Sequence, residues 1–392
     1  MHPLQLLLWL TSMCVFCYWG CADSPTQSRQ VSQGHLISCN PAHNDFENLS
    51  QLVDTTFYLP LESPPEHLIG SCTRLLAWEN RFYIVDKRKT RSVFAFDRHG
   101  KFLFQIRRVG RGPGEYTEPY AFIINKQARL LEIYDRTQRK ILSFDMQGNY
   151  LRERTFPWYV KDLIAVENNY LAYSTSYDPG YITHRLMLLS PQGAVLKQYL
   201  PFDQKEVDDL GVTNFSCQAG ISFTCWRYNT VFHLQGQQLL PAYTIEYGPY
   251  SVLDDFFQHD IIEHQMELLK AKGLAHGISD MLETDRYLTF TYMYNGHSNM
   301  AFYSKRTQQL LSSSRCLNDI DGVPVQPMKT TYQEYLVSII WPAAMERNLE
   351  MIQSDKFYRK VPVQVINRLK TLLKQTQPNS NPWLIFYKLK EF

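Results

Sequence analysis

The residues that could do chemistry are spread along this 392-residue chain without forming a recognised catalytic motif. There is no GxSxG turn, no GxxxxGK[ST] loop and no HExxH pair, which are the arrangements that serve acyl transfer, phosphate binding and zinc hydrolysis. His259 and His264 lie in a segment predicted to be helical, at a spacing that does not place two side chains on one face. We therefore expect solvated polar positions there, and we assign no catalytic residue, no metal ligand and no cofactor.

Tyrosines beside two loops suggest a different chemistry, namely stacking against a ligand. They are Tyr177, Tyr181, Tyr292 and Tyr294. A tyrosine ring is apolar on its faces and polar at its hydroxyl, so it can stack on a sugar or hold a peptide. The same side chains can instead fill the space between strands, and the sequence leaves both interpretations open. The four tyrosines are therefore candidate ligand-binding residues.

The stretch RRVGRGPGEYTEPYAF, residues 107–122, concentrates glycine and proline between two apolar runs. Its Gly-x-Gly-x-Gly spacing differs from the dinucleotide-binding GxGxxG, and no helix is predicted after it whose N-terminus could hold a phosphate. A structural joint is therefore favoured over an anion cradle. In such a joint we expect positive φ at Gly112 and Gly114, and a charge-assisted hydrogen bond between Arg111 and Glu115.

The elements that must position these residues recur with a period of about 45 residues. Residues 81–106 read as three apolar runs, FYIVD, SVFAFD and KFLFQI, and residues 130–156 repeat them as EIYD, ILSFD and NYLRE, which aligns Asp86 with Asp135. The turn glycines continue the series at Gly100, Gly148, Gly193 and Gly236. Short β-rich runs closed by a glycine predict antiparallel strands, and this period is typical of a four-stranded propeller blade.

Six such units predict an all-β fold, a six-bladed β-propeller. They cover residues 72–107, 118–156, 160–200, 213–247, 274–312 and, in two pieces, 330–341 and the end of the chain. The sixth unit lacks a strand, so we expect the apolar run 52–63 to complete it, because an open ring would leave unpaired edges.

Two helical inserts are predicted, at residues 253–273 and 343–375. Their apolar residues at helical spacing favour packing onto the propeller, and a groove for a partner helix is the alternative.

The first twenty residues contain no Asp, Glu, Lys or Arg, and their apolar run has the length of a secretory signal core. Gly20 followed by Cys21 resembles the lipobox of bacterial lipoproteins, in which the lipid-modified cysteine becomes the first residue of the mature chain. An ordinary secretory signal and an uncleaved anchor are the alternatives. The expected organisation is a signal peptide at 1–20, a lipidated linker at 21–51 and a propeller at 52–392.

Five cysteines follow Cys21. Because this number is odd, at least one has no disulfide partner within the chain. Cys217 and Cys225 are near enough in sequence for a bridge, but roles as small buried hydrophobic residues are favoured for both.

Residues 107–148 resemble the NHL-type propeller repeat, in which a glycine-rich connection and an acidic–aromatic pair precede a proline and two strand-ending turns. The matching residues are Gly110, Gly112, Gly114, Glu115, Tyr116, Pro119, Asp135, Phe144, Asp145 and Gly148. With the signal cysteine, the six repeats and the NPWLIFYKL ending, the chain is similar to the six-bladed propeller lipoproteins that are abundant in Bacteroidota. The resemblance implies an exported propeller from a group of mostly uncharacterised function.

Binding through loops around a central channel is the default use of a propeller. We therefore expect a membrane-anchored binding or scaffold module for a protein, peptide or glycan, held by its lipid in the cell envelope and facing outward from the outer membrane or into the periplasm. The alternative is a metal-dependent enzyme like the related propeller lyases and lactonases, with Glu79, Asn125 and Glu167 as its channel candidates. A net charge of +2 gives no electrostatic sign of nucleic-acid binding.

Overall fold

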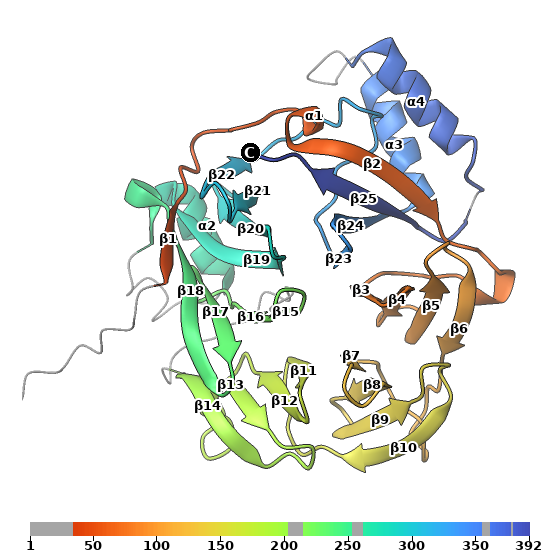
Figure 1. The fold of residues 1–392 in the computed structure, drawn as a ribbon, viewed down its shortest axis with the longest axis vertical. Helices are drawn as coiled ribbons and strands as arrows, with labels where there is room; N and C mark the ends of the chain where they lie inside the picture. Colours follow the sequence, from red (N-terminus) through yellow and green to blue (C-terminus); the bar gives the residue numbers. More distant parts are fainter. Residues whose placement is uncertain (1–33, 203–214, 253–261, 355–360, 378) are drawn as a thin grey trace, which may run out of the picture. The chain divides into compact units, whose positions relative to one another are not determined.

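A computed structural model describes residues 34–202, 215–252, 262–354, 361–377 and 379–392. All of them belong to one unit of the chain, Ser32–Phe392. The predictions for Cys21 and His259 lie outside the described residues. Within this unit the strands form six sheets, which follow one another around a common centre as the blades of a propeller (Figure 1). The prediction of a six-bladed β-propeller is therefore confirmed.

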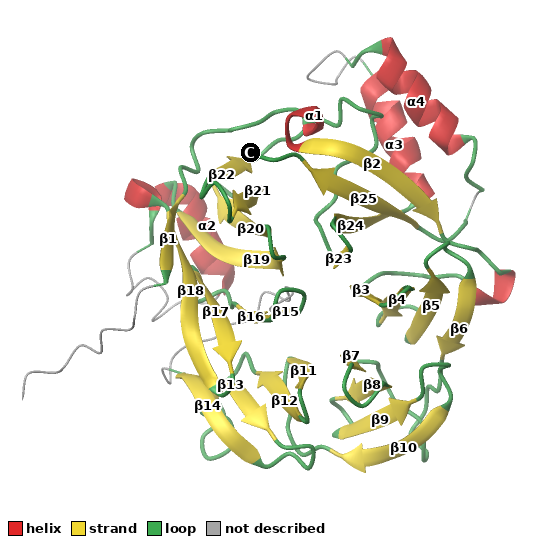
Figure 2. Cartoon of the chain, in the orientation of Figure 1, coloured by secondary structure: helices red, strands yellow, loops and turns green. Residues whose placement is uncertain are grey.

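Five blades are each built from four consecutive antiparallel strands, with the first strand nearest the centre (Figures 1 and 2). Blade 1 contains β3 (Arg74–Trp78), β4 (Arg81–Asp86), β5 (Ser92–Asp97) and β6 (Phe102–Ile106). Blade 2 contains β7 (Ala121–Asn125), β8 (Leu130–Asp135), β9 (Lys140–Phe144) and β10 (Tyr150–Thr155). Blade 3 contains β11 (Asp162–Val166), β12 (Asn169–Tyr173), β13 (His184–Leu189) and β14 (Val195–Pro201). Blade 4 contains β15 (Phe215–Ser216), β16 (Ile221–Phe223), β17 (Thr230–Gln235) and β18 (Gln238–Glu246), and blade 5 contains β19 (Ala275–Glu283), β20 (Tyr287–Tyr294), β21 (His297–Ser304) and β22 (Leu310–Ser313).

Blade 6 closes the ring by joining the two ends of the fold. Its inner strands are β23 (Thr330–Tyr332), β24 (Tyr335–Ile340) and β25 (Trp383–Leu389), and its outermost strand is the N-terminal β2 (Val53–Pro60). β2 pairs antiparallel with β25, and the ring of Phe57 stacks on that of Phe386 at 4.1 Å between centroids. The expected closure by the run 52–63 is confirmed.

A further N-terminal strand, β1 (His35–Ser38), extends blade 4 by pairing parallel with its outer strand β18. It lies within residues 21–51, which the sequence analysis assigns to a linker. The next residue, Cys39, and Ile37 are buried beside blades 4 and 5. Four residues, HLIS, are too short for an alternating pattern to reveal a strand, and the partner strand lies some two hundred positions away.

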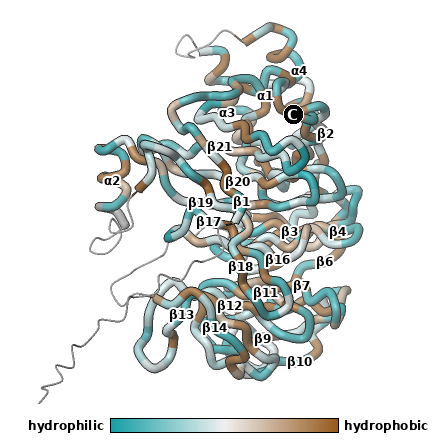
Figure 3. The backbone as a smooth tube through the Cα atoms, turned by 60° about the vertical axis from the view of Figure 1, so that its left-hand side comes forward, coloured by the Kyte–Doolittle hydropathy of each residue, from teal (hydrophilic) through white to brown (hydrophobic). Residues whose placement is uncertain are grey.

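The turn glycines that reveal the repeat adopt the backbone conformation that the turns require. Gly100, Gly148, Gly193 and Gly236 have φ values of 79°, 84°, 86° and 56°. Each lies in the turn between the third and fourth strands of one of blades 1 to 4. Hydrophobic stretches along the strands alternate with hydrophilic turns (Figure 3), and the buried side chains form clusters shared by neighbouring blades.

Helices occur where inserts are predicted, with one short addition near the N-terminus. They are α1 (Leu49–Leu52), α2 (Ile262–Lys272), α3 (Pro342–Gln353) and α4 (Val363–Leu373), with short 3₁₀ turns at Pro65–His67 and Gly248–Tyr250. Met345 of α3 and Leu369 of α4 are buried in the cluster of blade 6, so packing onto the propeller is confirmed for this insert. No helix among the described residues is long and apolar enough to cross a membrane.

Candidate functional site

The entry to blade 1 is fixed by the buried carboxylate of Asp86, at the end of β4. Its oxygens accept hydrogen bonds from the Ser71 backbone N–H at 3.1 Å and hydroxyl at 2.5 Å, just before β3. They also accept from the backbone N–H groups of Lys89 at 2.9 Å and Thr90 at 3.2 Å, in the turn after β4. Although burial alone would raise the pKa of Asp86, these hydrogen bonds hold it below its usual value. The ionised carboxylate therefore ties two loops together on one side of the ring.

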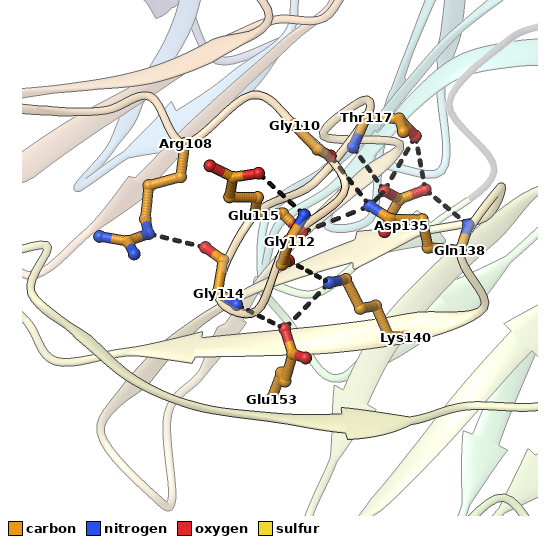
Figure 4. A network of polar contacts seen from close by, with 10 residues as sticks. All are labelled: Arg108, Gly110, Gly112, Gly114, Glu115, Thr117, Asp135, Gln138, Lys140 and Glu153. Carbon is orange, nitrogen blue, oxygen red and sulfur yellow. Dashed lines mark hydrogen bonds and ion pairs between the residues drawn. The ribbon is translucent and has the colours of Figure 1, made fainter.

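Asp135 does the same in blade 2, as the alignment of the repeats implies. Its carboxylate accepts hydrogen bonds from the Thr117 backbone N–H at 2.6 Å and hydroxyl at 2.9 Å, and from the Gln138 amide at 2.8 Å (Figure 4). Thr117 belongs to the glycine-rich connection from β6 to β7. This connection therefore ends in a fixed position, three residues before Tyr120.

The glycine-rich stretch is a joint between blades 1 and 2. The N–H of Gly114 donates to Glu153 of β10 at 2.9 Å, and Lys140 of β9 forms an ion pair with the same carboxylate at 2.9 Å (Figure 4). Nε of Arg108 donates to the Gly114 carbonyl oxygen at 2.6 Å. The loop is thus held against the strands of the second blade, which supports the structural interpretation of the motif.

Two details of the joint differ from the prediction. The Glu115 carboxylate accepts a hydrogen bond from the N–H of Gly112 at 2.8 Å, and no interaction among the described residues joins it to Arg111, whose side chain is exposed. The Glu115 carboxylate lies directly against Gly110, so close that a Cβ on residue 110 would overlap it. In this position the carboxylate is within reach of a backbone N–H. Gly114 has the expected positive φ of 71°, whereas Gly112 does not adopt positive φ.

The loops fixed by Asp86 and Asp135 surround a cavity of about 450 Å³ at one end of the central channel. We call it the basic pocket. Its polar lining contains four cationic side chains and one carboxylate, contributed by the entries to β3, β7 and β11 and by the turn after β4. These residues are Ser71, Thr73, Arg74, Lys87, Arg88, Tyr120, Lys161 and Asp162.

Lys87 is the most perturbed cation of the basic pocket. Its Nζ lies 3.4 Å from the centre of the Tyr120 ring and 3.0 Å from the Glu118 carboxylate. Arg136, which follows Asp135 as Lys87 follows Asp86, contacts the same ring at 3.8 Å. Burial and then the nearby charges of Arg136 and Lys161 lower the pKa of Lys87 to about 8. The cations repel one another here, and a bound anion would relieve that repulsion.

Arg74 and Asp162 form an ion pair at 2.8 Å between the first inner strand β3 and the third, β11. Because blade 2 stands between these two strands, the side chains meet in front of its inner strand β7, inside the channel. A guanidinium has five N–H donors, and this single hydrogen bond to Asp162 is the one that the described residues provide for Arg74. Its Nε is buried without a partner among them.

A second cavity of about 350 Å³ lies at the other ends of the same inner strands. We call it the apolar cavity. Its walls are mainly aliphatic and aromatic, and they include Leu76, Phe122, Ile124, Ile164, Ala165 and Ile221. Arg74 and Phe122 line both cavities. The channel is therefore basic at one end and apolar at the other, with Arg74 between them.

The four candidate tyrosines do not form a common surface. Tyr181 stacks on Trp158 at 4.9 Å, and Tyr177 packs edge-on against Phe202, both in the region of blade 3. Tyr292 is 1% exposed and packs against Tyr247 between blades 4 and 5, so a ligand has no access to it. The related Tyr294 packs against Tyr250. These contacts support the interpretation of the tyrosines as packing residues.

Glu79 and Glu167 lie in turns after inner strands, and Asn125 is the last residue of the inner strand β7. Glu79 and Glu167 have φ values of 53° and 51°, and Glu79 pairs with Arg129 at 2.8 Å. Asn125 accepts a hydrogen bond from the N–H of Ala128 at 3.0 Å and so closes its turn. No group of three or more His, Cys, Asp or Glu side chains suited to a metal occurs among the described residues.

No disulfide joins the cysteines that the structure describes, which are Cys39, Cys72, Cys217, Cys225 and Cys316. Cys225 is buried, as predicted, and Cys217 is half-buried at the wall of the apolar cavity. Burial raises the pKa of Cys217, which keeps the thiol protonated and unreactive.

The sequence analysis missed the cations of the basic pocket, because Arg74, Lys87 and Lys161 are far apart in the chain. One signal was available. The repeat aligns Asp86–Lys87 with Asp135–Arg136, so a basic residue follows the aligned aspartate in both blades. The ring then brings these two turns to the same end of the channel.

These sheets and cavities define a closed six-bladed β-propeller with ligand-sized space in its channel. Within that class, the chain belongs to the family described as a domain of unknown function, DUF4934, whose model matches residues 37–388. A comparison with curated proteins finds no significant match.

Two solved structures show the same fold. One is a protein from Bacteroides fragilis whose name describes it as a proposed exported protein. It is 18% identical to this chain, with a TM-score of 0.74, and the match covers 91% of this chain and 100% of that protein. The second is a member of the DUF4221 family from Bacteroides vulgatus, with 11% identity, a TM-score of 0.52, and coverage of 86% and 97%. At these identities the likeness concerns the fold alone.

Proposed function

We propose that this protein is an exported, lipid-anchored binding module, whose basic pocket takes an anionic group of a protein, peptide or glycan partner. The observation that carries the proposal is the convergence of four cations on one cavity, of which Arg74 pairs with Asp162 and Lys87 with Glu118. After burial, the charges of Arg136 and Lys161 lower the pKa of Lys87, and a bound anion offsets this repulsion. Tyr120, held between two of the basic residues, adds a ring against which a ligand can pack.

Replacing Lys87 and Lys161 together by glutamine is expected to weaken binding of a polyanion about tenfold or more at low ionic strength, because two close charges are removed from a partly buried site. Poly-L-glutamate and polygalacturonate serve as probes that carry carboxylates on a peptide and on a glycan. Isothermal titration calorimetry measures both, with neutral dextran as the uncharged reference.

The matched control is the double replacement of Arg98 and Lys101 by glutamine. Both side chains are exposed in the turn after β5, outside the basic pocket, and the change in net charge is the same. Equal losses for the two double variants would mean that binding follows net charge alone, and the proposed site would be rejected. A preference between the two polymers identifies the class of partner.

The membrane anchor is proposed from the sequence, on the lipobox-like Gly20–Cys21. Replacing Cys21 by alanine is expected to abolish labelling by radioactive palmitate and to move the protein from the membrane fraction to the soluble fraction of a bacterial host. Replacing Cys17 by alanine leaves both readouts unchanged. Retention of the palmitate label by the Cys21 variant would contradict the proposal.

A further inference from the structure

We infer that the partner bears its anionic group on an apolar chain, so that the channel takes an amphiphilic anion, with its charged group in the basic pocket and its apolar body in the apolar cavity. This inference rests on the proposed function, since it names the class of ligand for the same channel. It follows from three features of the channel: the position of Arg74, the polarity of the walls, and the space available.

Arg74 and Phe122 line both cavities, so the two cavities adjoin at these residues. The guanidinium of Arg74 has donors beyond its one hydrogen bond to Asp162. An anionic group at this junction lies beside the Arg74–Asp162 pair and finds the cations Lys87 and Lys161 on one side. On the other side it finds an aliphatic wall.

The polarity of the apolar cavity changes with depth. Leu76, Ile124 and Ala165, on the inner strands β3, β7 and β11, are half-buried and line its walls. Among the polar lining residues, Lys126, Gln127, Glu167 and Gln218 are exposed, and Asn125 at the end of β7 is half-buried. The deep part of the cavity, next to Arg74, thus offers few hydrogen-bonding partners.

The wall of the apolar cavity favours a hydrocarbon chain over a peptide. A peptide placed there would bury backbone N–H and C=O groups without partners, at a cost of about 1–3 kcal/mol for each group. A hydrocarbon chain carries no such groups and gains from contact with the walls. The volume of about 350 Å³ lies within the range of pockets that bind small molecules and is larger than a cavity that accommodates benzene. An alkyl chain ending in an anionic group fits both halves of the channel.

Octanoate is the probe, compared with acetate, which has the charge without the chain, and with octanol, which has the chain without the charge. We expect octanoate to bind about 4,000-fold more tightly than acetate, because it has six more methylene groups and each contributes a factor of about four when buried. We expect octanol to bind about tenfold more weakly than octanoate, because it lacks the charge that the basic pocket attracts. Isothermal titration calorimetry on the full mature chain measures all three, and a negative heat-capacity change for octanoate accompanies burial of its chain.

The variant Ala165→Leu fills part of the apolar cavity. It is expected to lower octanoate affinity at least about tenfold and to leave poly-L-glutamate binding unchanged. Ala128→Leu, in the exposed turn between β7 and β8, is the matched control. Since Ala165→Leu can also disturb packing against blade 2, Leu76→Gln tests the same wall by polarity instead of volume.

The outcomes separate this inference from the proposed function. If octanoate binds no more tightly than acetate, while poly-L-glutamate still depends on Lys87 and Lys161, the amphiphile is rejected and the basic site stands. If octanoate binds but Ala165→Leu and Leu76→Gln have no effect, the chain lies elsewhere and the inference is also rejected. If neither octanoate nor the polyanions bind, both proposals fail.

Discussion

The variant Gly100→Ala is expected to lower the free energy of unfolding by about 3 kcal/mol, which combines backbone strain at positive φ with overlap in a packed site. Gly100 has a φ of 79° in the turn between β5 and β6. A Cβ at this position would overlap the carbonyl oxygen of Pro60, at the end of the closing strand β2. Relief would require movement of the strand that seals blade 6, because the atom it meets is backbone.

Gly236→Ala is the matched control. Gly236 occupies the equivalent turn of blade 4, with a φ of 56°, and a Cβ there would meet no atom within 4 Å. Its replacement should cost only about 1 kcal/mol, from the left-handed backbone alone. Guanidinium denaturation of both variants measures the difference. Equal losses would show that Gly100 is needed only for its backbone conformation and that the contact with β2 contributes nothing.

The fold was largely predictable because a blade is a local unit. Each turn glycine, such as Gly148 or Gly193, marks a hairpin whose strands are neighbours in sequence, and six repeats leave few ways to arrange them. Closure followed from one missing strand in the sixth unit. The strand β1 was not predictable, since His35–Ser38 pairs with residues 243–246 and carries no repeat signal of its own.

The candidate site was less predictable because it depends on the closed ring. Arg74 and Asp162 come from non-adjacent blades, and no local pattern links them. The two interpretations of the tyrosines could not be separated from the sequence for a related reason. An apolar strand residue beside a loop has the same sequence signature whether it faces a ligand or the next blade, and here Tyr247 of the neighbouring blade covers Tyr292.

For the joint between blades 1 and 2, the sequence motif predicted the role of the loop but not all of its hydrogen bonds. Its role as a connection was predictable from Gly114, which takes the required positive φ. The partner of Glu115 was not, because a nearby arginine and a backbone N–H are equally available in sequence. The loop folds so that the N–H of Gly112 reaches the carboxylate first.

The variant Asp86→Ala connects stability with the site. The carboxylate of Asp86 is fully buried and accepts hydrogen bonds from the N–H groups of Gly70, Ser71, Lys89 and Thr90. Its removal leaves these donors unsatisfied, so we expect a loss of about 3 kcal/mol or more in the free energy of unfolding. Because Lys87 and Arg88 directly follow Asp86, binding of poly-L-glutamate should weaken as well.

Asp97→Ala is the matched control, in the next turn of the same blade. Asp97 accepts hydrogen bonds from the N–H groups of His99 at 2.8 Å and Lys101 at 3.0 Å, at an exposed site where water can replace it. We expect a loss of about 1 kcal/mol and no change in poly-L-glutamate binding. A similar loss of binding in both variants would disconnect Asp86 from the basic pocket.

The pH dependence of the unfolding free energy provides a second test of the role of the Asp86 carboxylate. The pKa of Asp86 is depressed in the folded chain, because hydrogen bonds to its ionised form outweigh the effect of burial. Its contribution to stability is therefore complete above the unfolded pKa of about 4 and is lost as the pH falls through the lower folded value. The difference in unfolding free energy between the natural chain and Asp86→Asn should be largest near neutral pH and shrink on acidification. A difference that stays constant from pH 7 to pH 2 would mean that the ionised carboxylate is not what holds the two loops together.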